Sequence, residues 1–219
     1  MRIFLDTADH RVARQLWSWG SFSGVTTNPI LLARAGVSVE DAMAELGRAT
    51  SGDLFAQAVG KTAAALADDG ARLAQLVPGR IIVKIPTTAY GLEAMRLLSA
   101  RNVLTAATAI FRASQAVLAA RAGATWVIPF WHRIAELGGD PAREVADSAN
   151  FLERMLSSGL RARVLCASLR TAEEAVAALR AGATGITVGP DVAHALLADP
   201  GTKATVEQFD QAAKVQVDE

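Results

Sequence analysis

The sequence predicts an α/β fold: a single (β/α)8 barrel of the TIM type with an additional C-terminal helix. Eight short β-rich apolar runs alternate with longer alanine-rich helical stretches, which is typical of a parallel sheet covered by helices. The length of 219 residues lies at the small end of the range for such barrels. An open doubly wound sheet would usually place a glycine-rich phosphate loop after its first strand, but Leu5-Asp-Thr-Ala-Asp9 contains no glycine. The barrel is therefore preferred.

Each predicted strand has four to six residues, close to the usual strand length. The predicted strands are residues 2–6, 24–27, 53–57, 80–85, 103–108, 125–130, 163–168 and 185–188. Helical patterns lie between them, for example at residues 91–101, 112–122 and 172–181. Thr171 followed by Glu174 has the spacing of a capping box, which predicts a helix start after the seventh strand.

One turn occurs twice, each time between a helix and a strand. Arg121-Ala-Gly-Ala-Thr125 is repeated as Arg180-Ala-Gly-Ala-Thr184, and the two central glycines suit the left-handed position that ends a helix. Since the surrounding units differ, we interpret this as a shared turn and not as a repeat protein. No linker divides the chain, so residues 1–219 are predicted to form one domain, with residues 202–219 as the C-terminal helix.

Composition excludes several classes of function. Lys and Arg total 22, as do Asp and Glu, so the formal charge is zero and indicates no binding to nucleic acid or to an anionic membrane. The single cysteine excludes an internal disulfide framework, and the scattered His10, His132 and His194 indicate no metal site. No apolar run reaches the roughly 18 residues that span a bilayer. We expect a soluble, cytoplasmic protein that needs no metal or cofactor.

Polar residues follow most of the predicted strands. Since barrel enzymes carry their chemistry at the C-terminal ends of the strands, these residues are candidates for an active site. The set comprises Asp6, Thr26, Thr27, Asn28, Gln57, Lys84, Thr108, Arg133, Ser168 and Arg170. A carboxylate, amides, an amine, hydroxyls and guanidiniums on one rim exceed what solvation of a barrel mouth requires.

Lys84 is the most informative of these residues because the chain has only four lysines. Alternation along the fourth strand points Arg80, Ile82 and Lys84 to one face and the intervening apolar residues to the other. Burial disfavours the charged ammonium and lowers its pKa, which makes the neutral amine available for imine formation. The alternative is a lysine that extends from an edge strand to solvent. A strand covered on both faces favours the buried nucleophile.

Other motifs indicate no chemistry. Gly60-Lys61-Thr62 resembles the end of a phosphate loop, but Phe55 occupies the position of the required earlier glycine. Cys166 lies inside an apolar strand and is interpreted as a packed thiol. His132 lies beside Arg133 at the end of the sixth strand, where it could reach a substrate.

Together these residues resemble the small transaldolase and fructose-6-phosphate aldolase family over essentially the whole chain. The segments that carry the resemblance are Phe4-Leu-Asp-Thr-Ala-Asp9, Gly24-Val-Thr-Thr-Asn-Pro29, Phe55-Ala-Gln57, Ile82-Val-Lys-Ile-Pro86 and Ala167-Ser168. The second and fourth of these, correctly spaced, are the specific ones.

The resemblance implies a class I enzyme in which Lys84 attacks a ketose carbonyl and the iminium accepts electrons as a carbon–carbon bond breaks. It implies that Asp6 is the acid/base and that Gln57 and Thr108 hold a catalytic water. Asn28, with Thr26 beside it, is implied to position the ketose. The anion-binding rim for the sugar phosphate is implied to consist of Arg133, Ser168 and Arg170.

Two positions separate the aldolase-type members from the transaldolase-type members. Aldolase-type members have tyrosine where this chain has Phe130, whereas transaldolase-type members have phenylalanine there. At Gln57 the chain matches the aldolase-type members instead. Since Phe130 cannot orient the water that protonates the enamine, the prediction is a transaldolase that transfers a dihydroxyacetone unit to an aldose acceptor. Free fructose-6-phosphate aldolase activity, or a sulfonated ketose as substrate, stays open because Trp131 and His132 differ from familiar members.

A different reaction class remains as an alternative. An isomerase would need a Glu or His base at a strand end, but the clear strand-end carboxylate is Asp6. A non-catalytic binder of sugar phosphates would be expected to lose Lys84 first. The resemblance also implies a role in the pentose phosphate pathway and a homo-oligomer, a ring-built decamer in which C-terminal helices pack on neighbouring subunits.

Overall fold

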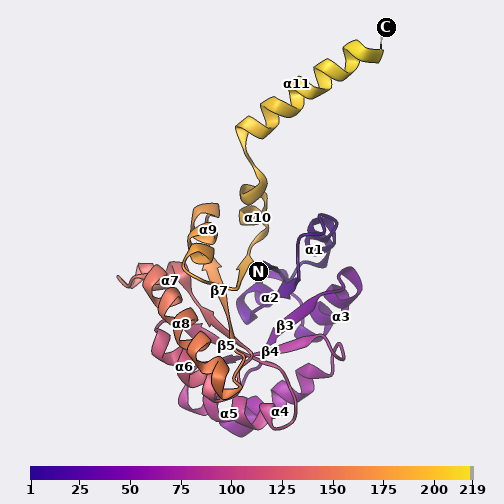
Figure 1. Cartoon of the computed structure of the whole chain (residues 1–219). Coiled ribbons are helices and arrows are strands. Elements are labelled where there is room, and N and C mark those ends of the chain that lie inside the picture. Colours follow the sequence, from indigo (N-terminus) through magenta and orange to yellow (C-terminus); the bar gives the residue numbers. More distant parts are fainter. Residues whose placement is uncertain (218–219) are drawn as a thin grey trace.

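The computed structural model describes residues 1–217 and contains a closed barrel of parallel strands in the order β1 to β8 (Figure 1). The strands are β1 (Arg2–Asp6), β2 (Gly24–Thr26), β3 (Asp53–Gln57), β4 (Ile81–Pro86), β5 (Thr105–Ile110), β6 (Trp126–Pro129), β7 (Arg163–Leu169) and β8 (Gly185–Val188). Each strand pairs with the next along the chain, and β1 pairs with β8, which closes the barrel. The predicted (β/α)8 fold is confirmed.

Helices surround the barrel, and three of the strands, β2, β6 and β8, are each followed by more than one helix. The helices are α1 (His10–Trp17), α2 (Pro29–Ala35), α3 (Val39–Ala49), α4 (Ala63–Ala74), α5 (Ala89–Ser99), α6 (Ala113–Arg121), α7 (Trp131–Glu136), α8 (Pro141–Met155), the 3-10 turn η1 (Leu156–Ser158), α9 (Ala172–Arg180), α10 (Pro190–Leu197) and α11 (Pro200–Val217). The short helices α2 and α7 begin directly after β2 and β6, at the carboxyl end of the barrel. They therefore bring side chains to the end where the candidate site was predicted.

The two predicted glycine turns and the predicted helix start after Thr171 are confirmed. Gly123 and Gly182 have φ values of 98° and 100°, a conformation that favours glycine, just after α6 and α9 end. Thr171 caps α9 by accepting a hydrogen bond from the N–H of Glu174. The Glu174 carboxylate, however, accepts from the N–H of Arg170 and not from that of the capping residue.

The fifth strand lies two residues later than predicted, at Thr105–Ile110 in place of 103–108. Its register with β6 shifts between Ala107 and Ile110, and Ala109 between them has a φ of 59°. A β-bulge of this kind inserts an extra residue and bends the strand. Because the residues ahead of the bulge retain their alternation, Thr108 still reaches the carboxyl end of the barrel.

The barrel interior is filled by aromatic side chains. Phe4 and Phe55 meet edge to face with their ring centroids 5.2 Å apart, and Phe4 meets Trp126 in the same way at 5.8 Å. Below them, at the amino end of the strands, the guanidiniums of Arg2 and Arg163 lie over the Trp126 ring. Arg2 also forms an ion pair with Asp53 at 2.7 Å. The amino end of the barrel is therefore closed.

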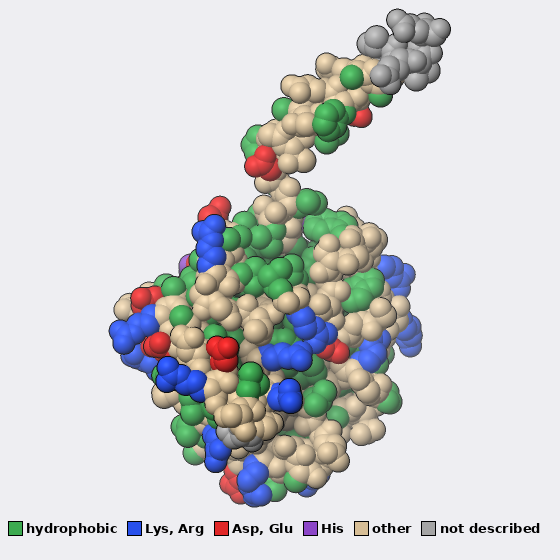
Figure 2. Space-filling model, in the orientation of Figure 1, with side chains coloured by type: hydrophobic (Ala, Val, Ile, Leu, Met, Phe, Trp, Pro, Cys, Tyr) green, Lys and Arg blue, Asp and Glu red, His purple; other side chains and the backbone are tan. Residues whose placement is uncertain are grey.

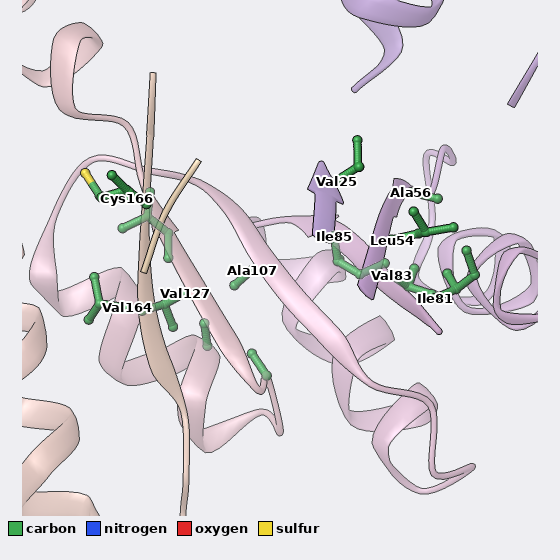
Figure 3. Packing of buried hydrophobic residues seen from close by; sticks show 14 of the residues in the cluster. Val25, Leu54, Ala56, Ile81, Val83, Ile85, Ala107, Val127, Val164 and Cys166 are labelled. Atoms are coloured by element: carbon green, nitrogen blue, oxygen red, sulfur yellow. The ribbon is translucent and has the colours of Figure 1, made fainter. Parts of the chain in front are cut away.

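A second apolar layer lies between the strands and the helices (Figure 3). Ile81, Val83 and Ile85 of β4 belong to it, whereas Ile82 belongs to the barrel interior, as the alternation predicted. Arg80 departs from the predicted pattern because β4 begins one residue after it. Its guanidinium donates to the carbonyls of Gly47 and Gly52 at the amino end of the barrel. Cys166 is packed in this outer layer, and burial raises the pKa of its thiol to about 12.

The C-terminal helix α11 extends away from the barrel (Figure 1). It begins at Pro200, two residues before the predicted start, and the final two residues of the predicted helix, 218–219, lie outside the described residues. Residues 194–214 are exposed throughout. Apolar side chains also gather on the barrel surface at the base of this extension (Figure 2). None of the described helices is long and apolar enough to cross a membrane.

We expect the Phe4→Ala variant to lose about 3–5 kcal/mol of unfolding free energy, because it leaves a cavity beside the rings of Phe55 and Trp126 in the packed interior of the barrel. Phe4 is 0% exposed, whereas Phe151 on α8 is 38% exposed and offers a matched control. Urea unfolding measures both variants. An equal loss in Phe4→Ala and Phe151→Ala would contradict the role given to the interior aromatic cluster.

Candidate active site

A cavity of about 550 Å³ opens at the carboxyl ends of the strands. Its apolar floor includes Ile128 and Ala167, which belong to the barrel interior. Above this floor, the predicted site residues that line the cavity are Asp6, Thr26, Asn28, Gln57, Lys84, Thr108, Phe130, Arg133, Ser168 and Arg170. Residues spread over most of the chain therefore meet in one site, because parallel strands present their ends on the same side.

Lys84 lies at the centre of this polar layer and is only 5% exposed. Its Nζ donates a hydrogen bond to the carbonyl oxygen of Thr27 at 2.8 Å. Removal from water disfavours the ammonium and lowers the pKa of Lys84, although the negative charge of Asp6 acts in the opposite direction. A larger fraction of the amine is therefore neutral and nucleophilic near neutral pH than for a lysine in solvent.

Asp6 faces the same cavity from the end of β1. Burial raises the pKa of its carboxyl group, and the charge of Lys84 and a hydrogen bond from Thr26 oppose this rise without cancelling it. Thr26 Oγ1 donates to Asp6 Oδ1 at 2.7 Å and also lies 2.6 Å from Thr187 Oγ1. A carboxyl group with a raised pKa that is held in place by a hydroxyl is suited to take up and return a proton.

Two further groups beside Lys84 could hold a small polar molecule. Gln57 and Lys84 are paired residues of neighbouring strands, and Thr108 is paired with Pro86 on the next strand. The Thr108 hydroxyl is buried and has no hydrogen-bond partner among the described residues. Since buried hydroxyls normally find a partner, this group is available to a water molecule or to a substrate.

Asn28 has a structural task in addition to its place on the cavity wall. Its Oδ1 accepts hydrogen bonds from the N–H groups of Ile30 and Leu31, each at 3.0 Å, and so caps α2. The side-chain oxygen is therefore engaged with the helix. The amide NH2 remains as the group that Asn28 can offer to a ligand.

The opposite wall of the cavity carries cationic side chains. The Arg133 guanidinium lies over the ring of Phe130, 5.2 Å from its centroid. Ser168 has a φ of 58°, which is uncommon for a residue with a side chain, and the register of β7 with β8 shifts around it. Arg170 follows two residues later and also lines the cavity. Guanidiniums and a hydroxyl on one wall are suited to an anionic group.

Thr27 and His132 are the two predicted site residues that do not line the cavity. Thr27 is buried, and its hydroxyl donates to the Phe55 carbonyl at 2.9 Å. His132 lies outside the cavity. Its ring lies on the outer side of α7, where Nδ1 is 2.7 Å from Glu174 Oε1. The neighbouring Trp131 is buried. The α-helical turn that directs Arg133 toward the cavity thus turns His132 toward α9.

Sequence reasoning missed two polar lining residues, Arg34 and Thr187. Alternation along β8 could have identified Thr187, since it lies near the carboxyl end of that strand. No local signal identifies Arg34, because its place depends on how α2 lies against the mouth of the barrel. The described residues contain no group of three or more His, Cys, Asp or Glu side chains that could hold a metal ion.

In its fold the chain is similar to the crystal structure of inosine 5′ monophosphate dehydrogenase from Legionella pneumophila. The TM-score is 0.61 and the sequence identity is 12%; the match covers 88% of this chain and 59% of that chain. The present chain thus spans less than two thirds of the length of the chain it matches. A likeness at this identity shows the barrel fold alone.

Comparison with family models gives a specific result. The model described as Transaldolase/Fructose-6-phosphate aldolase matches residues 3–219, essentially the whole chain. Enzymes of this family belong to the aldolase class, and a Schiff-base mechanism is consistent with the buried lysine in the barrel. The chain is a member of the transaldolase/fructose-6-phosphate aldolase family.

Proposed function

We propose that the protein is a transaldolase that transfers a dihydroxyacetone unit from a ketose phosphate to an aldose acceptor through an imine on Lys84. The observation that carries this proposal is the buried amine of Lys84 in a cavity that Asp6 also lines. Burial lowers the pKa of this amine. A neutral amine in this position attacks the ketose carbonyl carbon, and loss of water leaves an iminium.

In the next step Asp6 takes the proton of the C4 hydroxyl, the C3–C4 bond breaks, and its electron pair moves to the iminium to give an enamine. The aldose leaves with the new carbonyl. In transfer, C3 of the enamine attacks an acceptor aldehyde, Asp6 returns its proton to the new hydroxyl, and water hydrolyses the iminium. The raised pKa of Asp6 suits both proton transfers. The amide NH2 of Asn28 is free to hold a hydroxyl of the ketose.

Free aldol cleavage is the second candidate activity, and Gln57 favours it. With Thr108, whose hydroxyl has no partner among the described residues, Gln57 could hold a water that protonates the enamine. Phe130 adds no hydroxyl to this water, which favours transfer. We therefore place transfer first.

We assign the distal anion of the substrate, a phosphate or a sulfonate, to Arg133, Ser168 and Arg170. These residues line one wall of the cavity: Arg133 lies on the short helix α7, Ser168 near the end of β7, and Arg170 in the β7–α9 turn. Arg34 lies on the opposite side, on α2, and adds a further cation near the mouth. An anionic sugar is the substrate class that this charge distribution favours.

We also propose that the protein assembles as a homo-oligomer through α11, functions in the cytoplasm and belongs to sugar-phosphate metabolism. Helices in proteins gain most of their stability from packing against other elements, yet Val206 and Phe209 of α11 are exposed. A second copy of the chain is the partner that the family relationship favours, as a decamer.

Imine formation on Lys84 tests the proposal. Borohydride added with dihydroxyacetone should fix a three-carbon adduct on the tryptic peptide that contains Lys84, as measured by mass spectrometry. Lys84→Met should abolish both the adduct and the activity with fructose 6-phosphate and erythrose 4-phosphate, because no other lysine lines the cavity in the described part of the chain. The yield of the adduct should increase with pH, and the increase should occur over a lower pH range than for an ordinary lysine, because burial lowers the pKa of Lys84.

Lys61 supplies the matched control, since it is exposed in the loop after β3. Lys61→Met should retain the adduct and the activity. An adduct found on Lys61, or a fully active Lys84→Met, would exclude the proposed mechanism.

Loss of Arg133 should weaken the use of phosphorylated substrates. Removing a charge-assisted hydrogen bond costs about 1.5–3 kcal/mol, so Arg133→Ala should lower kcat/KM for fructose 6-phosphate roughly ten- to a hundredfold. Ser168→Ala should act in the same direction with a smaller effect. Fructose, which lacks the anion, is the control substrate, and Arg143→Ala on the exposed face of α8 is the control variant. Equal losses with fructose and fructose 6-phosphate would refute the anion assignment.

Replacing Phe130 by tyrosine tests the balance between transfer and cleavage. The added hydroxyl can help to orient a water for protonation of the enamine, a type of assistance worth about a hundredfold when fully developed. Phe130→Tyr should therefore release more glyceraldehyde 3-phosphate in the absence of an acceptor, relative to the rate with erythrose 4-phosphate. An unchanged ratio in an active variant would show that Phe130 does not set this balance, and the aldolase assignment would then take precedence.

A further inference from the structure

The imidazole of His132 lies between two carboxylates. It lies behind the wall of the cavity that is formed by Arg133, Ser168 and Arg170, the anion wall. Its Nδ1 is 2.7 Å from Oε1 of Glu174 on α9, and its Nε2 is 3.5 Å from Oε1 of Glu136 on α7 itself. His132 and Glu174 are both partly buried, with side-chain exposures of 26% and 20%. The ring therefore connects α7 to α9 in a setting more shielded than that of a surface ion pair.

Both carboxylates also contact Arg170. Oε2 of Glu174 accepts a hydrogen bond from the Arg170 N–H at 2.6 Å, and Oε1 of Glu136 lies 3.2 Å from Arg170 Nη2. Arg170 is thus held at its backbone by one glutamate and at its guanidinium by the other, and His132 joins the two. Arg170 in turn lines the cavity.

The segment that this network holds needs support. Ser168, two residues before Arg170, is in the left-handed conformation, with a φ of 58°. A residue with a side chain adopts this conformation at a cost and retains it only when its surroundings impose it. The register shift between Cys166 and Leu169 removes regular sheet pairing at this point. The Glu174 bond to Arg170 lies directly after this strained turn.

The charge state of Glu174 suits this task. Burial acts to raise its pKa, but the N–H of Arg170 and the ring of His132 outweigh burial and hold the pKa below its ordinary value. The carboxylate therefore stays ionised at neutral pH and keeps both of its hydrogen bonds.

We propose that His132 is a positioning residue that, through Glu174 and Glu136, fixes Arg170 and the turn at Ser168 in the geometry that binds the substrate anion. This inference rests on the assignment of the anion to Arg133, Ser168 and Arg170. His132 itself touches no substrate. Its ring holds in place the Arg170 guanidinium and the backbone at Ser168, which form part of the proposed anion site.

The test uses inorganic phosphate as the probe, with its Kd measured by calorimetry, together with kcat and KM for fructose 6-phosphate. His132→Ala and Glu174→Ala should each weaken phosphate binding and raise KM about three- to tenfold, the effect of one ordinary hydrogen bond, with little change in kcat. Glu174→Gln should restore most of the loss, because its amide retains an oxygen for the Arg170 N–H and an NH2 for the imidazole.

Two controls separate positioning from loss of folding. His194→Ala removes an exposed imidazole that packs against Trp19; neither residue lines the cavity, so phosphate binding should stay intact. Borohydride trapping of dihydroxyacetone, which has no anion, should stay at the wild-type level in His132→Ala and Glu174→Ala.

The outcomes distinguish this inference from the proposed function. If Arg133→Ala weakens phosphate binding but His132→Ala and Glu174→Ala do not, the positioning role is wrong and the anion wall stands. If the wild type binds no phosphate, or Arg133→Ala binds it as the wild type does, the anion wall itself is wrong and the inference falls with it. A Glu174→Gln variant as impaired as Glu174→Ala would also overturn the hydrogen-bonded network.

Discussion

The burial of one amine at the top of an apolar barrel is the constraint on which the rest of the site depends. Lys84 lies above an interior filled by Phe4, Phe55 and Trp126, so few polar groups are available to solvate its ammonium from below. Its hydrogen bond to the Thr27 carbonyl and the nearby charge of Asp6 make this burial tolerable. The desolvation that lowers the pKa of Lys84 also raises that of Asp6. One physical cause therefore shifts both pKa values in the directions that suit the proposed nucleophile and the proposed acid/base.

Two strands have irregular backbone where they reach the mouth of the cavity. Ala109 after β5's Thr108 and Ser168 on β7 both have left-handed φ values, and both line the cavity at points where the strand register shifts. Regular strands would continue the inward and outward alternation, whereas these two positions re-aim the chain at the mouth. Arg170, two residues after Ser168, contacts both Glu174 and Glu136, and we infer that these contacts hold the left-handed turn at Ser168 in place.

Most of the site was predictable because alternation in a parallel strand fixes which side chains reach the barrel mouth. Asp6, Gln57, Lys84 and Thr108 follow from that rule and from the strand boundaries alone. Arg34 and His132 do not, since their places depend on how α2 and α7 lie against the barrel, and such tertiary packing leaves no local pattern. The later position of β5 has a similar cause: β-branched or apolar residues such as Val103 resemble a strand, but the pairing begins only at Thr105.

The closed amino end of the barrel limits where small molecules can enter and leave the cavity. Trp126 and the two arginines over it seal that end, and the aromatic rings fill the space above them. In the proposed group transfer, departing and arriving sugars would therefore share the mouth of the cavity at the carboxyl end of the barrel. A leaving aldose would have to vacate this opening before the next one enters, so we expect the proposed transfer to follow a double-displacement order. The two aldoses would then compete for the same modified form of the enzyme.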